Sequence, residues 1–271
     1  MFTTVDSLGV ELPYYGIMVA FGILACFLLL LFTKNKRENI EGIEYVLIGL
    51  VGAGSAFLMS HIVYGIAHFN KIAFVATHPK RLFESINSFV FYISDIFGGM
   101  VFYGGLIGAC IGAYIYMKKA RLNVNEYSDT LAPCIPLFHA FGRIGCFLAG
   151  CCYGIESEIG FTYRYAIVES ANGVCRFPVQ LLEATENILI CVLLTILLCK
   201  CKKIQHGMLI WIYGLIYPVV RFTNEFLRGD VVERGFFGVL STSQWISIFI
   251  FVLSLIMILV RLLKKDKKEQ V

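Results

Sequence analysis

Long apolar runs separated by short polar segments dominate this sequence of 271 residues. A helix needs about 20 predominantly apolar residues to cross a bilayer, and seven runs approach that length. The runs lie near residues 14–32, 44–68, 98–117, 131–150, 185–199, 207–227 and 244–263. The pattern predicts an all-α polytopic membrane protein with about seven transmembrane helices, in which residues 1–271 form a single membrane-embedded domain.

Two segments between the runs have patterns of their own. From Leu82 to Phe97, apolar residues recur at helical spacing, with serine and asparagine between them. This spacing predicts an amphipathic helix at the membrane interface, or alternatively an extension of the third span. Residues 151–184 contain an aromatic and β-branched stretch at 160–168, followed by the hairpin-turn signal Asn172-Gly173. We expect residues 151–184 to form a small outer cap with short strands.

Charge adds an orientation to this picture. Only 15% of the residues are charged, against about 25% in soluble domains, so a separate soluble domain is not expected. Of the 23 Lys and Arg residues, 14 lie in one set of alternating loops and the C-terminal tail, and seven lie in the other. The positive-inside rule then predicts an N-terminus outside and a C-terminus in the cytoplasm. The basic tail favours anionic membrane lipid, and no nucleic acid, as its partner.

Arg143 lies inside the fourth run, among the glycines of residues 139–154. A charged side chain at the bilayer centre costs about 2.5–3.5 kcal/mol on insertion scales, so it needs a reason to be there. Glycines let a ligand or another backbone approach closely. The combination predicts an anion site within the membrane, and the alternative is an arginine that snorkels to the headgroups. His139 precedes Arg143 by one turn, either as a catalyst or as a packing residue.

Arg221 and Glu225 are four residues apart in the sixth run and therefore share one helix face, and Arg228 follows one turn later. Two arginines beside a carboxylate are typical of a phosphate site with an acid or base next to it. An ion pair with a purely structural role is the alternative reading.

Two further segments carry candidate residues. Paired glycines flank Tyr103 at the start of the third run, where Gly104 either contacts a ligand or packs against another helix. At the start of the fifth run, Pro178 suits a first helical turn, and Gln180 and Glu183 follow it. Glu183 is either a site residue or a partner of the helix dipole.

Cys146, Cys151 and Cys152 lie close together in the sequence at the end of the fourth run. Three thiolates could hold zinc with one further donor, but the spacing matches no standard zinc motif. We therefore expect no metal and no cofactor. We also expect Cys151 and Cys152 to be dispensable, because cysteine serves well as a small, weakly polar filler.

In this order the motifs resemble the prolipoprotein diacylglyceryl transferase family. Gly142-Arg143-Ile144-Gly145, with Gly150 and Gly154 at the right offsets, is similar to its signature, although the family usually has asparagine where this chain has Cys146 and an acidic residue at Cys151. The other similar segments are the glycine-rich third run, Pro178 to Ala184, Arg221 to Arg228, Pro13 to Gly16, and Ser241 to Ser247.

The resemblance implies a multi-pass enzyme of the bacterial inner (plasma) membrane that transfers a diacylglyceryl group from phosphatidylglycerol to the lipobox cysteine thiol of a preprolipoprotein, releasing glycerol phosphate. The residues implied in catalysis are Arg143, Arg221, Glu225, Tyr103 and His139. Those implied in substrate binding are Tyr15, Gly104, Gly142, Gly154, Gln180, Glu183 and Arg228. Two other readings stay open: a membrane thiol protein with redox or metal-binding activity, and a lipid-binding protein without chemistry.

Overall fold

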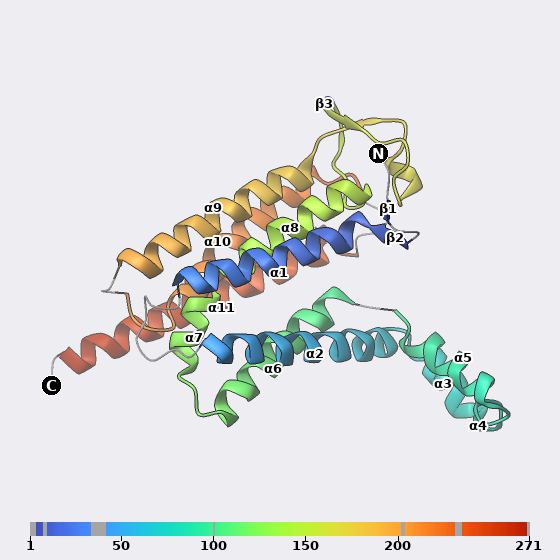
Figure 1. The fold of residues 1–271 in the computed structure, drawn as a ribbon, viewed down its shortest axis with the longest axis horizontal. Coiled ribbons are helices and arrows are strands. Elements are labelled where there is room, and N and C mark those ends of the chain that lie inside the picture. Colours follow the sequence, from blue (N-terminus) through green and yellow to red (C-terminus); the bar gives the residue numbers. More distant parts are fainter. Residues whose placement is uncertain are drawn as a thin grey trace. The chain divides into compact units, whose positions relative to one another are not determined.

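The computed structural model describes residues 4–7, 10–33, 42–99, 101–201, 204–230 and 235–269 (Figure 1). The chain divides into two compact units. The large unit comprises Met1–Asn39 and Asn125–Val271, and the small unit comprises Ile40–Val124. Both consist mainly of helices, and the described residues also form small two-stranded antiparallel sheets.

The large unit is a bundle of long helices that run side by side, with the cap at one end (Figure 1). Its helices are α1 (Tyr14–Thr33), α7 (Val124–Leu131), α8 (Cys134–Ala149), α9 (Val179–Lys200), α10 (Leu209–Asn224) and α11 (Thr242–Glu269). Helix α8 packs between α1 and α9, and α10 packs against α9 and α11. Small residues allow the close contact between α1 and α8, because a Cβ on Gly145 would meet the ring of Tyr15 at 2.9 Å.

The centre of the bundle is apolar, with Leu194 and Leu209 fully buried. Asp129 of α7 is also fully buried, and its carboxylate accepts hydrogen bonds from the backbone N–H groups of Gly207 and Leu209 at 2.8 and 2.9 Å. A carboxylate at this position satisfies backbone donors at the start of α10 and complements its helix dipole. This contact fixes α7 to the start of α10.

Large apolar side chains cover the outer surfaces of the helices, which is the arrangement expected of a protein solvated by lipid. Within the part of the chain that the structure describes, five helical segments can cross a membrane by length and composition: Tyr14–Thr33, Gly42–Ala67, Val124–Ala149, Val179–Lys200 and Thr242–Leu263. The protein is thus a multi-pass helical membrane protein. The other two predicted runs also contain helices, of 18 and 16 residues, but these are not among the five.

The small unit contains α2 (Gly42–Ala67), α3 (Phe69–Thr77), α4 (Pro79–Leu82), α5 (Ile86–Phe97) and α6 (Phe102–Lys119). A stripe of glycines packs α6 against α2. A Cβ on Gly108 would lie 2.4 Å from the carbonyl oxygen of Ser55, and Cβ atoms on Gly104 and Gly112 would also clash with α2. These glycines therefore serve close helix packing.

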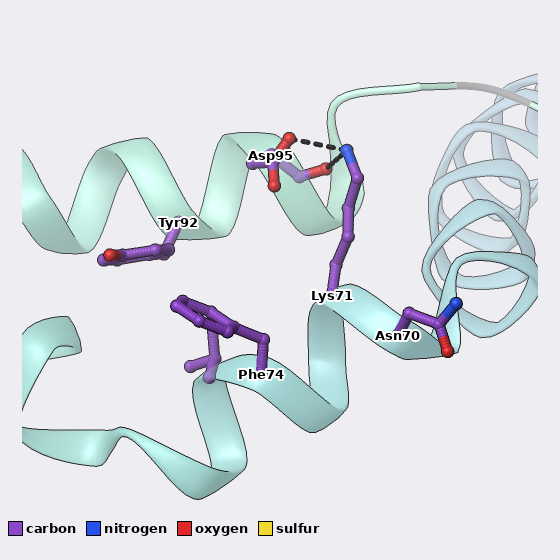
Figure 2. Close-up of a pocket in the computed structure, with 6 residues that line it drawn as sticks. Asn70, Lys71, Phe74, Tyr92 and Asp95 are labelled. Carbon is purple, nitrogen blue, oxygen red and sulfur yellow. Dashed lines mark hydrogen bonds and ion pairs between the residues drawn. The ribbon is translucent and has the colours of Figure 1, made fainter.

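The amphipathic segment forms α5, a helix separate from α6. Its N-cap is Ser85, whose hydroxyl accepts a hydrogen bond from the backbone N–H of Ser88 at 3.0 Å. The expectation of a distinct amphipathic helix is confirmed, whereas α3 and α4 were not predicted. A pocket of about 270 Å³ lies between α3 and α5, where Lys71 Nζ contacts Asp95 Oδ1 at 2.5 Å beside Phe74 and Tyr92 (Figure 2).

The short strands predicted within residues 151–184 are present, and the last residues of this segment belong to α9. Strand β3 (Glu156–Thr162) pairs with β4 (Cys175–Arg176), and a short 3₁₀ turn (Glu169–Ala171) lies between them. Gly173 has a positive φ of 79° and donates its N–H to the carbonyl of Tyr163 at 2.9 Å. However, residues 163–174 connect the two strands, so Asn172-Gly173 is not the two-residue hairpin turn that the sequence predicted. The strand begins at Glu156, earlier than the predicted 160–168. The hairpins β1–β2 (Thr4–Ser7 and Val10–Pro13) and β5–β6 (Phe236–Phe237 and Leu240–Ser241) were not predicted.

Candidate active site

Glu183 joins two arginines that come from two other helices. Its carboxylate on α9 forms an ion pair with Nε of Arg143 on α8, and its second oxygen lies 3.2 Å from Nη1 of Arg221 on α10. The side chain of Glu183 is 4% exposed, and those of both arginines are 12% exposed. Removing charges from water is costly unless each has a partner, so the shared carboxylate explains how both arginines can lie inside the bundle.

Glu225 extends this arrangement. It follows α10 in the 3₁₀ turn Glu225–Leu227, and its Oε2 lies 2.7 Å from Nη2 of Arg221, one turn earlier. The same Nη2 donates to the hydroxyl of Ser243 in α11 at 3.2 Å. We call Arg143, Glu183, Arg221 and Glu225 the ion network. It contains two positive and two negative charges and connects α8, α9 and α10.

Ser243 is held in place by the start of α11. Gln244 Oε1 accepts from the backbone N–H of Ser241 at 2.9 Å, and the backbone N–H of Gln244 donates to the Ser241 hydroxyl at 3.3 Å. This reciprocal pair is a capping box. The Ser241 and Ser243 hydroxyls are 2.9 Å apart, so the cap also orients the group that accepts from Arg221.

His139 lies beside the ion network and contacts it through Arg143. The guanidinium Nε of Arg143 donates to His139 Nε2 at 3.3 Å, which requires that this nitrogen carry a lone pair. The imidazole ring packs edge-on against Tyr217, with ring centroids 5.2 Å apart. These contacts orient Arg143, which favours a positioning role for His139.

Arg228 has a different partner. Its Nε donates to Asp230 Oδ1 at 2.8 Å, and the two side chains also form an ion pair through Nη2 and Oδ2. Its backbone forms a β-bridge with Gly154. A Cβ on Gly154 would lie 2.2 Å from the carbonyl oxygen of Phe177, so close backbone packing explains why glycine is needed there.

Gln180 connects the cap to α9. It is almost fully buried, and its Nε2 donates to the carbonyl of Cys151 at 2.8 Å and to the hydroxyl of Tyr163 at 3.4 Å. Burial raises the pKa of Tyr163 to about 12, so this hydroxyl stays protonated at neutral pH. Gln180 thus orders the cap and contacts no member of the ion network among the described hydrogen bonds.

The remaining predicted residues fall into three groups. Tyr15 is half-exposed and packs on Gly145, next to the signature segment. Gly142 faces open space, since a Cβ there would meet nothing within 4 Å. Gly104 belongs to the small unit and packs against α2, while the side chain of Tyr103 lies outside the described residues.

The structure also supplies partners that were not singled out in the sequence. Asp230 holds Arg228, Ser243 holds Arg221, and Arg176 orders the cap. Asp230 follows Arg228 by only two residues, so the sequence could have indicated this ion pair. The packing of α10 on α11 brings Ser243 to Arg221, and no local sequence pattern predicts that contact.

A thiol cluster lies next to the ion network. The sulfur atoms of Cys146, Cys151 and Cys152 all lie within 4.8 Å of one another, and each residue is half-buried. Gly150 ends α8 in the left-handed conformation, and Cys152 also has a positive φ, of 54°. Hydrogen bonds from the other two thiols, aided by the charges of Arg228 and Arg143, lower the pKa of the Cys152 thiol.

The fold and the buried ion network together define a multi-pass membrane protein with a charged site between its helices. Residues 4–260 match the family model described as prolipoprotein diacylglyceryl transferase. A phosphatidylglycerol–prolipoprotein diacylglyceryl transferase 2 of Clostridium perfringens is 35% identical over 97% of this chain and 96% of its own length. Similar enzymes of Clostridium tetani and Helicobacter pylori are 32% and 31% identical, over 92% and 91% of this chain and 93% and 88% of theirs. The chain belongs to the prolipoprotein diacylglyceryl transferase family.

Proposed function

We propose that this protein transfers the diacylglyceryl group of phosphatidylglycerol to the cysteine thiol of a prolipoprotein lipobox, forming a thioether and releasing glycerol phosphate. The observation that carries the proposal is the ion network, in which Glu183 holds Arg143 and Arg221 together within the membrane bundle. The similarity to enzymes with this activity over nearly the whole chain supports it.

The chemistry of the reaction explains why two arginines are needed. Thioether formation breaks the bond between the glyceryl carbon and the phosphate oxygen, and the electron pair leaves with the phosphate. The phosphate then changes from a diester with one negative charge to a monoester with up to two. Guanidinium groups are planar donors that match phosphate oxygens, and they stabilise charge that develops in a water-poor site.

The described contacts leave donors for that phosphate. Among the described residues, Arg143 engages Glu183 and His139 through Nε, so its terminal Nη groups are the candidates to bind a phosphate oxygen. Arg221 divides its Nη groups among Glu183, Glu225 and Ser243. We assign Arg143 to the phosphate, Glu183 to holding both arginines, and Glu225 to accepting a proton or positioning Arg221.

The remaining site residues keep their proposed roles in substrate binding. Tyr15, Gly142 and Gly154 lie on or next to the segment that carries Arg143, and Gln180 and Arg228 order the adjoining cap. Tyr103 and Gly104 remain proposals without a described contact to the ion network. Tyr103 would orient the phosphate rather than abstract a proton, because its ordinary pKa is about 10.

The membrane arrangement belongs to the same proposal. We infer seven transmembrane helices in one membrane-embedded domain, an N-terminus outside, a cytoplasmic C-terminus and a location in the bacterial inner membrane. The excess of Lys and Arg in alternate loops and the tail supports this orientation. Cysteine-accessibility labelling of loop variants in whole cells tests it, and labelling of residues 200–203 from outside would reverse the assigned orientation.

The activity is tested with purified protein, isotopically labelled phosphatidylglycerol and a peptide that carries a lipobox. The expected product is a thioether-linked peptide, identified by mass, together with labelled glycerol phosphate. A peptide with serine in place of the lipobox cysteine is the matched control. Phosphatidylglycerol binding without thioether formation by any lipobox peptide would favour a lipid-binding protein over a transferase.

A further inference from the structure

The thiol cluster brings together three potential metal ligands, one fewer than a tetrahedral site requires. Zinc binds thiolate sulfur at about 2.3 Å in a tetrahedral arrangement, which places neighbouring sulfur atoms roughly 3.8 Å apart. The three sulfur atoms of Cys146, Cys151 and Cys152 already lie within 4.8 Å of one another, so small rotations of the side chains suffice. Structural zinc sites have four protein ligands, whereas catalytic ones have three and leave a position open.

The backbone supports the convergence of the three thiols. Helix α8 carries Cys146 in its last turn, and the left-handed Gly150 reverses the chain, so that Cys151 and Cys152 lie against that turn. The backbone N–H of Cys151 donates to the carbonyl of Cys146 at 3.1 Å. Cys152 adopts a positive φ, which is unfavourable for a residue with a side chain and persists only where its surroundings impose it.

A divalent ion would also offset most of the charge of the three thiolates. Three thiolates with one divalent ion carry a net charge of −1, and a fourth thiolate brings it to −2. Arg143 and Arg228 already have the carboxylate partners Glu183 and Asp230, so the convergence of the three sulfur atoms carries the zinc assignment.

We propose that Cys146, Cys151 and Cys152 bind one zinc ion, and that the open position of this ion binds the acceptor cysteine of the protein substrate as a thiolate. This inference deepens the proposed transferase function and rests on it. It reverses the expectation from the sequence that Cys151 and Cys152 are dispensable, because sequence spacing did not reveal that the three sulfur atoms converge.

The site would solve the problem of activating the nucleophile. A thiol coordinated to zinc loses its proton, here to solvent, and the resulting thiolate remains a nucleophile. Its sulfur attacks the glyceryl carbon of phosphatidylglycerol, the carbon–sulfur bond forms, and the carbon–oxygen bond to phosphate breaks with its electrons on oxygen. The thioether product binds zinc more weakly than the thiolate does, which favours product release. No oxidant or reductant is required.

The experiment measures metal content and then probes the open position. Protein purified without air from zinc-supplemented cells is analysed for zinc and for thiol oxidation. We expect one zinc per chain, lost in Cys146→Ser and in the double variant Cys151→Ser/Cys152→Ser. The matched control is Cys175→Ser, which changes a half-buried cysteine of the same cap outside the cluster. Absence of zinc from the wild-type protein, or a disulfide among the three cysteines, would overturn the inference.

The open position is probed with cobalt, because the visible absorption of Co²⁺ reports its ligands without any need for turnover. The zinc of the wild-type protein is exchanged for Co²⁺, and lipobox peptides are added. We expect the cysteine peptide to shift the cobalt spectrum and release about one proton at neutral pH, and the serine peptide to do neither. If the spectrum of the bound cobalt did not change when the cysteine peptide was added, the metal site would be a closed structural site. That result would refute the role in acceptor binding.

Failure of this inference and failure of the transferase function give different results. Thioether formation by metal-free wild type, retained in the double serine variant, would refute the zinc site and leave the transferase intact. A cobalt spectrum that responds to the cysteine peptide, without thioether formed from phosphatidylglycerol, would refute the transferase and support a thiol-binding metal protein.

Discussion

Among the buried arginines of the large unit, those of the ion network and Arg176 of the cap have different kinds of partner. In the ion network, Arg143 and Arg221 are paired with the carboxylate of Glu183 from a third helix. In the cap, Arg176 donates to the carbonyls of Ser170 at 2.7 Å and Ala171 at 3.3 Å, and its guanidinium lies 4.3 Å from the ring centroid of Tyr153. Burial is similar in both regions, but the kind of partner differs.

On the proposed function, this difference would distinguish a phosphate-binding arginine from a structural one. Arg176 donates its hydrogen bonds to backbone carbonyls of the cap. It therefore supplies donors that a short, irregular segment cannot provide from its own backbone. The network arginines are neutralised by carboxylates, and their donors are not exhausted. On the proposed function, an arriving phosphate would accept hydrogen bonds from these remaining donors, whereas the hydrogen bonds of Arg176 are already made to backbone carbonyls.

Arg143→Ala should reduce the rate of thioether formation by about 10²–10³-fold or more, which is the size of effect seen when a donor to developing negative charge is removed. The variant should also lose stability, because Glu183 loses one of its two partners. Arg143→Lys tests geometry, and it should recover stability more than activity because an ammonium lacks the planar fork. Initial rates per mole of folded protein provide the measurement. An Arg143→Ala variant with near-normal turnover would remove the phosphate from this site.

Glu225→Gln should lower turnover by about 10²-fold while phosphatidylglycerol still binds. The change keeps the shape of the side chain and removes the charge that lies 2.7 Å from Arg221. Rates and lipid affinity are measured together, since a proton acceptor affects the rate and a binding group affects affinity. The exposed Glu158→Gln in β3 is the control. Weaker lipid binding with an unchanged maximal rate would assign Glu225 to binding alone.

Arg176→Ala should destabilise the protein by about 2–4 kcal/mol, because it removes the donor to the carbonyls of Ala171 and Gly154, which are buried residues. The rate per mole of folded protein should change less than threefold, since no donor of Arg176 is assigned to substrate. Thermal unfolding in detergent, compared with the exposed Arg164→Ala, measures the effect. If Arg176→Ala lost activity but kept full stability, the kind of partner, carboxylate or backbone carbonyl, would no longer distinguish binding arginines from structural ones.

Much of the architecture was predictable because lipid imposes strong rules on a sequence. Helices at all seven apolar runs, the amphipathic α5 and the stranded cap follow from hydrophobic periodicity and from the aromatic and β-branched residues of the cap. The helices α3 and α4 were missed because their residues do not form a long periodic run. The N-terminal hairpin, β1–β2, lacks a two-residue turn signal of the Asn-Gly type.

The sequence singled out the members of the ion network but not the contacts between them. Arg143 and Arg221 stood out as charges in apolar runs, and Glu183 as a charge at the start of one. Only the packing of α8, α9 and α10 shows that one carboxylate holds both arginines. The roles of the glycines were the hardest to predict, because the same residue type serves several structural purposes. Gly108 allows two helices to touch, Gly154 allows backbones to cross, and Gly150 supplies a left-handed turn. Local sequence does not distinguish these.

Substitution of Gly142 by alanine is expected to change the structure least. A Cβ at this position meets nothing within 4 Å, whereas one at Gly108 lies 2.4 Å from the carbonyl of Ser55. Gly142→Ala should therefore leave the unfolding temperature unchanged or slightly higher, since alanine favours a helix by about 1 kcal/mol over glycine. Gly108→Ala should lower it. If the space beside Gly142 receives the lipid headgroup next to Arg143, then Gly142→Ala should still weaken phosphatidylglycerol turnover by about tenfold. Full activity in a stable Gly142→Ala protein would place the headgroup elsewhere, and Arg143 would then reach it from another direction.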